Sequence, residues 1–568
     1  MINFKGNPFY LSNEDIRWVK TTLASLTLEE KICQLFCLVV KGDEKADLQR
    51  ITEKYKPGGF MCRPMSAAKV TEIVRTLQET SRVPMLVAAN LESGGIGIAE
   101  EGTHIGSHMQ VAATDNYEMA YKLGTICGRE GSAVGVNWAF APIIDIDYNF
   151  RNPITNTRTF GSNPETVKNM GAEYVMAVQK HGVAASIKHF PGDGMDERDQ
   201  HLVTSINSMS CEKWDETYGK AYKMCIDAGA LSVMVGHIMQ PAYTKKYNPE
   251  VKEEDILPAT LSYELITKLL KEKLGFNGLV VTDASTMAGM IIPMPREKAV
   301  PLAIAAGCDM FLFTRNLDED YEFMKKGIEE GIITAERLNE ALSKILALKA
   351  ALKLHKKKEN GKLVPSLEEA NKILGNEEHR NWATECADKA ITLVKNKEGV
   401  LPIDPNKYKK VLFYGIEGGE GFTRSARVGV TERFKTLIEK EGFEVDVFTP
   451  KPGFEGMVTP FSTVADQYDL IIYLANLATK SNQTVVRIEW EQPMGANVPV
   501  YVSCVPTIFI SVENPYHLLD VPRVKTYINT YSSSDSVLAA LVDKLMGRSK
   551  FIGKSPVDAF CGMWDTHL

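Results

Sequence analysis

The chain of 568 residues lacks long hydrophobic runs and extended basic tracts. Its most apolar stretch, residues 299–313, is interrupted by Pro301 and Asp309. It therefore falls short of the roughly 20 apolar residues that a membrane helix needs. The first twenty residues have no basic start followed by an apolar core, so we expect no secretory signal peptide. These absences predict a cytoplasmic protein that does not cross a membrane.

Cysteine pairing motifs are missing as well. The ten cysteines are scattered, with no CxxC pattern, and Cys33 and Cys37 in an apolar segment are expected to be buried, reduced thiols. The formal net charge of −7 provides no general attraction to nucleic acids or anionic lipids. We therefore expect neither nucleic acid nor a membrane among the partners.

What the chain does contain is a repeated alternation of apolar runs and helical stretches. A chain of 568 residues is too long for one core, so several domains are expected. Eight short apolar runs occupy residues 36–40, 58–61, 85–89, 136–144, 184–187, 232–235, 279–282 and 310–313. Helical patterns lie between them at residues 70–81, 164–181, 211–228 and 262–274. The pattern predicts an α/β fold with an N-terminal (β/α)8 TIM-like barrel, and an open doubly wound sheet is the alternative.

A second domain follows. After a predicted helix over residues 335–354, the charged stretch that begins at residue 356 has the composition of a linker. Apolar runs then return at residues 411–414, 444–448, 470–474 and 507–512. We predict a barrel over residues 1–355, a linker over 356–384, and a C-terminal α/β sandwich of flavodoxin-like type over 385–568.

Polar residues gather at the ends of the predicted strands. They are Asn90, Glu92, Asp145, Asp147, Lys188, His189, His237, Asp283 and Arg315. The carboxyl ends of barrel strands all open on one face, where active sites are built from the following loops. Each residue taken alone also fits helix capping. Six such strand ends together favour an active site.

Three residues carry the most specific chemistry. Asp283 directly follows a predicted strand and can act as a nucleophile, a base or a metal ligand. Asp199 lies two residues before His201, so the carboxylate can orient the imidazole for proton transfer, although a solvated loop is the plainer alternative. His104 and His108 lack the glutamate of an HExxH motif, and we expect no metal there.

Several segments together resemble glycoside hydrolase family 3. These are AFAPIIDID, NPITNTRTFGSNPE, GVAASIKHFPGDG followed by DQH, and LVVTDASTMAGM, in the family's order. They are most similar to its β-N-acetylglucosaminidase branch. The later segments ADKAITLVKN and VPTIFISVENPYHLLDVPRVKTYINTYSSS resemble the two-domain members, so the resemblance covers nearly the whole chain.

The resemblance implies a retaining, exo-acting β-N-acetylhexosaminidase. Asp283 matches the family nucleophile, and His201 with Asp199 matches the acid/base pair of this branch. Substrate-binding positions are matched by Asn90, Arg158, Lys188 and His189. The resemblance implies no metal or organic cofactor. We expect a small glycan as substrate, such as a peptidoglycan fragment, and a monomer or small homo-oligomer.

The chain also departs from the family pattern. Asn90 replaces an aspartate, Gly95 replaces an arginine and Ile98 replaces a basic residue, while Asp193 stands where the KHFPGHG form has histidine. An amide loses the charge-assisted part of a hydrogen bond to sugar. Another sugar specificity, phosphorolysis by the same residues, or a sugar-binding protein without catalysis therefore remain as alternatives.

Overall fold

A closed eight-stranded parallel barrel forms the first half of the protein. The computed structural model describes residues 2–40, 42, 44–418, 429–479 and 481–568. The barrel strands are β1 (Phe36–Val39), β2 (Gly59–Met61), β3 (Leu86–Ala89), β4 (Trp138–Ala139), β5 (Ala184–Phe190), β7 (Ser232–Val235), β9 (Leu279–Thr282) and β10 (Phe311–Leu312). A parallel bridge between Val281 and Met310 joins the last two strands and closes the sheet. The predicted barrel is thus confirmed, and the open sheet is excluded.

All eight strands lie where the apolar runs indicate, and β4 and β5 differ most from the predicted lengths. The run over residues 136–144 forms a strand only at Trp138–Ala139, because Pro142 has no N–H to donate to a ladder. β5 extends through Lys188 and His189 to Phe190, past the predicted end at residue 187. These two side chains therefore belong to the strand and share its rigidity.

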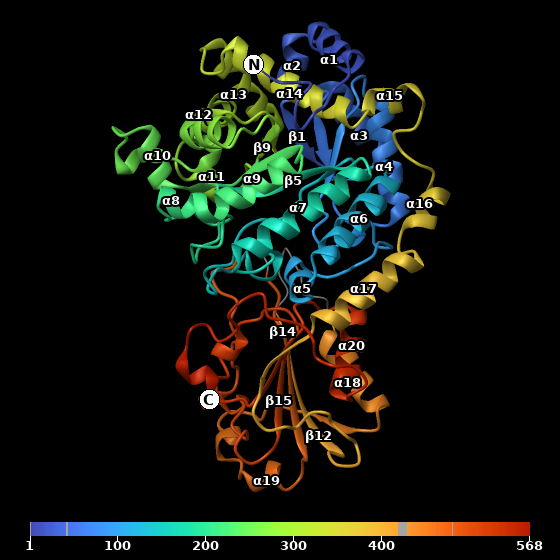
Figure 1. Ribbon diagram of the computed structural model, residues 1–568, viewed down its shortest axis with the longest axis vertical. Helices are drawn as coiled ribbons and strands as arrows, with labels where there is room; N and C mark the ends of the chain where they lie inside the picture. Colours follow the sequence, from blue (N-terminus) through green and yellow to red (C-terminus); the bar gives the residue numbers. More distant parts are fainter. Residues whose placement is uncertain (1, 41, 43, 419–428, 480) are drawn as a thin grey trace. The chain divides into compact units, whose positions relative to one another are not determined.

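Helices surround the barrel and connect its strands (Figure 1). The first segment forms α1 (Asn13–Ser25) and α2 (Leu28–Gln34), each started by a capping box. The helices between strands are α3 (Lys45–Tyr55), α4 (Ala67–Thr80), α6 (Tyr117–Ala133), α7 (Pro164–Lys180), α8 (Cys211–Trp214), α9 (Lys220–Asp227), α10 (Pro241–Tyr247), α11 (Ala288–Ile291) and α12 (Arg296–Ala306). Two stretches are π-helical, η3 (Asp215–Gly219) and η6 (Glu264–Lys273). α13 (Leu317–Glu329) and α14 (Ala335–Ala351) follow the last strand.

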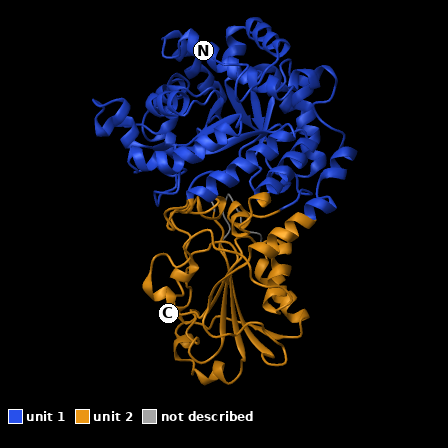
Figure 2. Ribbon diagram, viewed as in Figure 1, with its two compact units in different colours: residues 1–104, 120–146, 164–380 blue, residues 105–119, 147–163, 381–568 orange. Residues whose placement is uncertain are grey.

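The chain divides into two compact units whose boundaries differ from a simple cut along the sequence (Figure 2). The first comprises residues 1–104, 120–146 and 164–380, and the second comprises residues 105–119, 147–163 and 381–568. Two segments between barrel strands are therefore part of the second unit. The region proposed as a linker, residues 356–384, contains α16 (Leu367–Ile373), most of α15 (Leu354–Glu359) and the start of α17 (Glu377–Ala390).

The second unit is built on a six-stranded sheet. Its strands are β11 (Thr392–Asn396), β12 (Lys410–Glu417), β13 (Glu444–Val447), β14 (Leu470–Asn476), β15 (Thr507–Ser511) and β16 (Thr526–Asn529). The order β13-β12-β14-β15-β16 is the flavodoxin-like order, and β11 adds an antiparallel edge next to β16. The predicted sandwich is confirmed, while β11 and β16 are strands that the sequence analysis did not assign.

Alternating side chains of this sheet form two cores, because successive strand residues point to opposite faces. One face packs on α18 (Val430–Lys440) and α20 (Asp535–Leu545), through Phe434 and Leu541 among others. The other face carries a row of stacked rings, Tyr414, Tyr473, Phe509 and Tyr527. A third cluster packs Met109 of α5 (His108–Ala113) against Tyr531. The short helix α19 (Ser462–Ala465) completes the unit.

In the part of the chain that the structure describes, no helix combines the length and apolarity needed to cross a membrane. Cys33 and Cys37 are buried, as expected. Burial raises the pKa of Cys33 to about 12, so this thiol stays protonated.

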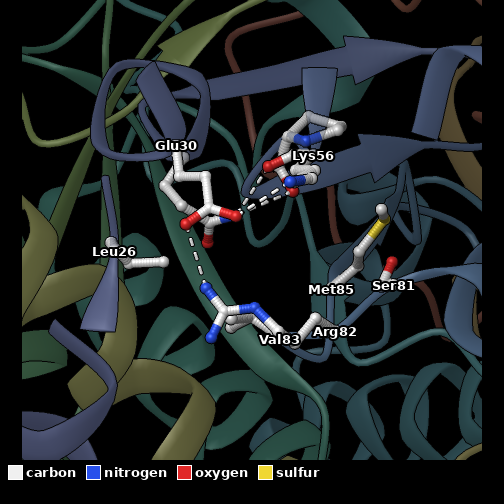
Figure 3. Close-up of a pocket in the computed structure, with 9 residues that line it drawn as sticks. Leu26, Glu30, Lys56, Ser81, Arg82, Val83 and Met85 are labelled. Carbon is white, nitrogen blue, oxygen red and sulfur yellow. Dashed lines mark hydrogen bonds and ion pairs between the residues drawn. The ribbon is translucent and has the colours of Figure 1, made fainter. Parts of the chain in front are cut away.

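A small pocket near the starts of β2 and β3 is lined by an ion-pair cluster (Figure 3). Glu30 pairs with Lys56 at 2.9 Å and with Arg82 at 3.0 Å. Burial would raise the pKa of Glu30, but its bonds to Lys56 and the Thr27 backbone and the charge of Arg82 lower it. This end of a barrel serves stability, whereas catalysis is placed at the opposite face.

We predict that Glu30→Gln lowers the free energy of unfolding by about 1 kcal/mol or less and leaves kcat/KM unchanged, because both cations are half exposed. Glutamine can still complete the capping box. The folded pKa of Glu30 is depressed, so the stabilisation is present above its unfolded pKa and is lost as the pH falls through the folded value. Urea unfolding at neutral and acidic pH measures this.

The matched control is Glu72→Gln, which removes the exposed Lys69–Glu72 pair of α4 and is expected to change nothing. A large loss of kcat/KM in Glu30→Gln would contradict the assignment of a purely structural function to this pocket.

Candidate active site

Asp283 follows β9 directly and is held in place by the neighbouring strand. Its backbone N–H donates to the carbonyl of Val235 at 2.8 Å, and its Oδ1 accepts the N–H of Ala284 at 2.7 Å. Only 9% of the residue is exposed. Burial by itself would raise the pKa of Asp283, but the nearby imidazoles of His189, His237 and His201 outweigh it, so the pKa is lowered. The carboxylate is therefore ionised and available as a nucleophile at neutral pH.

Asp199 and His201 form the expected pair. The His201 Nδ1 lies 2.6 Å from the Asp199 Oδ1, which also accepts the His201 backbone N–H at 2.9 Å. The Asp199 side chain is completely buried, whereas 30% of the His201 side chain is exposed. Because Nδ1 is bonded to the carboxylate, Nε2 is the nitrogen that can exchange a proton with a bound molecule. The Asp199 carboxylate, two residues away in sequence, thus orients the His201 imidazole.

Lys188 and His189 are both bound by carboxylates. The Lys188 Nζ lies 2.7 Å from Glu92 Oε1, after β3, and both groups are largely buried. The His189 Nδ1 lies 2.7 Å from Asp145 Oδ2, and its backbone N–H donates to Asp145 Oδ1 at 3.0 Å. Fixed cationic and imidazole donors of this kind suit recognition of sugar hydroxyls.

His237, at the end of β7, supports the loop of the nucleophile. Its Nε2 lies 3.1 Å from the carbonyl of Ala284, and its Nδ1 lies 2.9 Å from Thr260 Oγ1. Burial lowers the pKa of His237, against the opposing charge of Asp283, so the ring is neutral at pH 7. A carbonyl only accepts, which assigns a ring proton to Nε2.

The structure brings most of the predicted residues together. In the first unit, Asp283 interacts electrostatically with His189 and His201. Asn90 also lies in this unit, exposed directly after β3. Arg158, at the end of η2 (Asn156–Arg158), belongs to the second unit, where its guanidinium donates to the carbonyl of Ile154 at 3.4 Å.

The segment that departs from the family pattern is closely packed. Ile98 is fully buried. A Cβ placed on Gly95 would overlap the side chain of Glu130, whose carboxylate is fixed by the Thr103 N–H at 2.7 Å and by His379 at 2.6 Å. An arginine at position 95 has no room in this arrangement. The two positions where the family pattern has basic residues are therefore closely packed here, by a buried isoleucine and by a glycine against Glu130.

Four supporting residues were not assigned to the site from the sequence: Glu92, Asp145, Gln200 and His237. The sequence signal for three of them is their position as polar residues directly after predicted strands: Glu92, Asp145 and His237. Gln200 gave no such signal, because it lies inside the loop. Of the other two strand-end residues, Arg315 donates its backbone N–H to Asp320, and Asp147 belongs to the second unit.

Among the described residues, no group of three or more His, Cys, Asp or Glu side chains is arranged to hold a metal ion. His108 instead begins α5, with its ring against Phe160 at 4.5 Å between centroids. The carboxylates and imidazoles described above can serve as nucleophile and proton-transfer groups.

Comparisons with known proteins identify the family of the chain. Residues 27–348 match the model of the glycosyl hydrolase family 3 N-terminal domain. A β-N-acetylglucosaminidase/β-glucosidase from Cellulomonas fimi is 53% identical over 569 residues, covering 100% of both chains. The structure of the β-glucoside phosphorylase BglX is similar with a TM-score of 0.93 and 44% identity, over 99% of each chain. A family 3 β-N-acetylglucosaminidase from Paenibacillus sp. str. FPU-7 has a TM-score of 0.78 and 26% identity, over 94% of this chain and 99% of that one.

The family model covers more than half of the chain, and the Cellulomonas fimi relative extends the similarity to its whole length. The chain therefore belongs to glycosyl hydrolase family 3 and is a glycosidase of that family.

Proposed function

We propose that the protein is a retaining, exo-acting β-glycosidase that removes terminal β-N-acetylglucosamine, and also β-glucose, from small glycans. The observation that carries the proposal is the joint presence of an ionised, buried Asp283 and an oriented His201–Asp199 pair. The similarity to a relative that carries both activities in its name supports the two sugars. A peptidoglycan fragment in the cytoplasm is the substrate that we propose.

The reaction has two displacements. Asp283 Oδ2 attacks the anomeric carbon while the His201 Nε2–H protonates the departing glycosidic oxygen, which leaves a glycosyl-enzyme ester and a neutral imidazole. In the second step an acceptor attacks the same carbon and expels the carboxylate. When the acceptor is water, His201 takes its proton, and two inversions return the β-configuration.

Phosphate is the second acceptor that we propose. Asp199 is buried behind its imidazole, so an incoming anion meets His201 and no exposed carboxylate from the acid/base pair. Phosphate already carries the negative charge that a water molecule must gain by losing a proton. The similarity to a solved β-glucoside phosphorylase supports this acceptor.

A panel of nitrophenyl glycosides, with and without phosphate, tests the proposal. We expect nitrophenol release from the β-N-acetylglucosaminide and the β-glucoside, and a rate increase of about tenfold with phosphate, a factor that needs only about 1.4 kcal/mol. NMR should identify the product as the β-sugar-1-phosphate.

Each component of the proposal has its own contrary result. Activity on the β-glucoside without activity on the β-N-acetylglucosaminide would refute the sugar assignment. Free sugar as the sole product at high phosphate would refute the phosphate acceptor. Sugar binding without any turnover would favour a binding protein that has lost catalysis.

A further inference from the structure

Gln200, between the two residues of the acid/base pair, is buried and bonded at both ends. Its Oε1 accepts the backbone N–H of His237 at 2.8 Å, and its Nε2 donates to Asp193 Oδ2 at 3.3 Å. The residue is only 2% exposed. An N–H requires an acceptor and a carboxylate requires a donor, so the amide has one orientation that satisfies both. The side chain therefore connects the loop of His201 with the barrel.

The two partners of Gln200 lead to two other parts of the site. The Asp193 N–H donates to Asp145 Oδ1 at 2.8 Å, and Asp145 also binds the ring of His189. The ring of His237 contacts the carbonyl of Ala284, the residue after the nucleophile. Gln200 thus connects two hydrogen-bonded groups: Asp193 and Asp145 beside His189, and His237 beside the loop of the nucleophile.

Backbone contacts bring the same loop close to α11. The N–H groups of Ala288 and Gly289 donate to the carbonyls of His201 and Gln200 at 3.1 and 3.3 Å. A Cβ on Gly289 would lie 2.6 Å from the Gln200 carbonyl oxygen, and one on Gly236 would lie 3.0 Å from Gln200 Oε1. The approach of Gly289 to the Gln200 backbone requires glycine, and at Gly236 the end of the Gln200 side chain is closely packed.

We propose that Gln200, with Asp193 as its partner, is a positioning residue that holds the His201 imidazole at the distance needed for proton transfer. This inference rests on the proposed function of His201 as the acid/base. It also gives Asp193, which stands where histidine is commoner in the family pattern, a definite function: it accepts the amide that fixes the loop.

Reversing the hydrogen bond provides the test. In Gln200→Glu the group facing Asp193 loses its donor, and two carboxylates face each other. In Asp193→Asn two amide N–H groups face each other. The double variant Gln200→Glu/Asp193→Asn restores one donor and one acceptor, and the carboxylate introduced by Gln200→Glu can still accept the His237 N–H.

The readout is the dependence on the leaving group. We expect each single variant to lose about 10- to 100-fold in kcat/KM on a phenyl glycoside, which needs protonation, and less than about threefold on a dinitrophenyl glycoside, which does not. The double variant should recover most of the phenyl glycoside activity. Arg198→Gln, which replaces a half-exposed guanidinium in the same loop by an amide that can still donate to Asp196, is the control expected to behave as the wild type.

Three results would overturn the inference: equal losses on both substrates, which indicate a structural effect; no recovery in the double variant; or wild-type behaviour of both single variants. His201→Ala is measured in parallel. If it shows no dependence on the leaving group, the proposed function has failed; if it does and the Gln200 variants do not, only the inference about Gln200 has failed.

Discussion

Asp283→Ala is expected to reduce turnover by about 10⁴-fold or more, on every substrate and with either acceptor. Both displacements require this carboxylate, as nucleophile in the first and as leaving group in the second. Loss of the nucleophile cannot be offset by a better leaving group. Steady-state kinetics on dinitrophenyl glycosides measures the loss, and circular dichroism checks that the variant is folded.

The pH dependence follows from the charges around Asp283. Its imidazole neighbours hold the pKa below the usual value, against the opposing effect of burial. The carboxylate therefore stays ionised when the pH falls from 7 to 5, and a loss of kcat/KM in that range must come from another group. By linkage, the stabilisation of the folded state by Asp283 is present above its unfolded pKa and is lost only as the pH falls through the lower folded value.

Azide makes the Asp283→Ala prediction stereochemically specific. Azide that occupies the space of the missing carboxylate attacks once, from the α face, and gives the α-glycosyl azide. Asp318→Asn, an exposed carboxylate of the same unit, should behave as the wild type. Substantial residual turnover in Asp283→Ala, or a β-azide product, would show that another residue is the nucleophile.

His201→Ala is expected to show the second-largest effect, and its size depends on the leaving group. A phenyl glycoside should lose about 10² to 10⁴ in kcat/KM, because the departing oxygen no longer receives a proton. A dinitrophenyl glycoside should lose little in its first step and accumulate the glycosyl-enzyme. Comparing burst size and steady-state rate on both substrates measures this.

Azide again gives a distinct product, because in His201→Ala it attacks the ester on Asp283. Two inversions then yield the β-glycosyl azide, opposite to the product expected of Asp283→Ala. Arg198→Gln in the same loop is the matched control. Equal losses on both glycosides, with no azide product, would contradict the assignment of His201 as acid/base.

Most of the barrel could be predicted because its strands are buried on both faces. Continuous apolar runs mark such strands, and all eight lie where the runs indicate. β4 is shorter than its apolar run. Pro142 has no N–H to donate to a neighbouring strand, and burial alone does not make a strand. β11 and β16 were not assigned, and β11 has the mixed burial of an edge strand, which leaves a weaker pattern.

The site was predictable to the extent that its chemistry is local. Asp199 and His201 are two residues apart, so loop geometry alone pairs them. Glu92 and Lys188 are 96 residues apart, and Asp145 and His189 are 44 apart. Nothing in the sequence pairs such residues, because the strand ends that carry them become neighbours only when the barrel closes.

The sequence by itself determined the barrel, the second α/β unit, the family and the candidate residues Asp283, Asp199 and His201. Apolar periodicity and short motifs are local properties, so they can be recognised in the sequence alone. The tertiary structure alone decided which carboxylate binds which cation, that segments 105–119 and 147–163 belong to the second unit, and that Gln200 joins the acid/base loop to the barrel. Those facts depend on contacts between distant parts of the chain, which form only when parallel strands place their ends side by side.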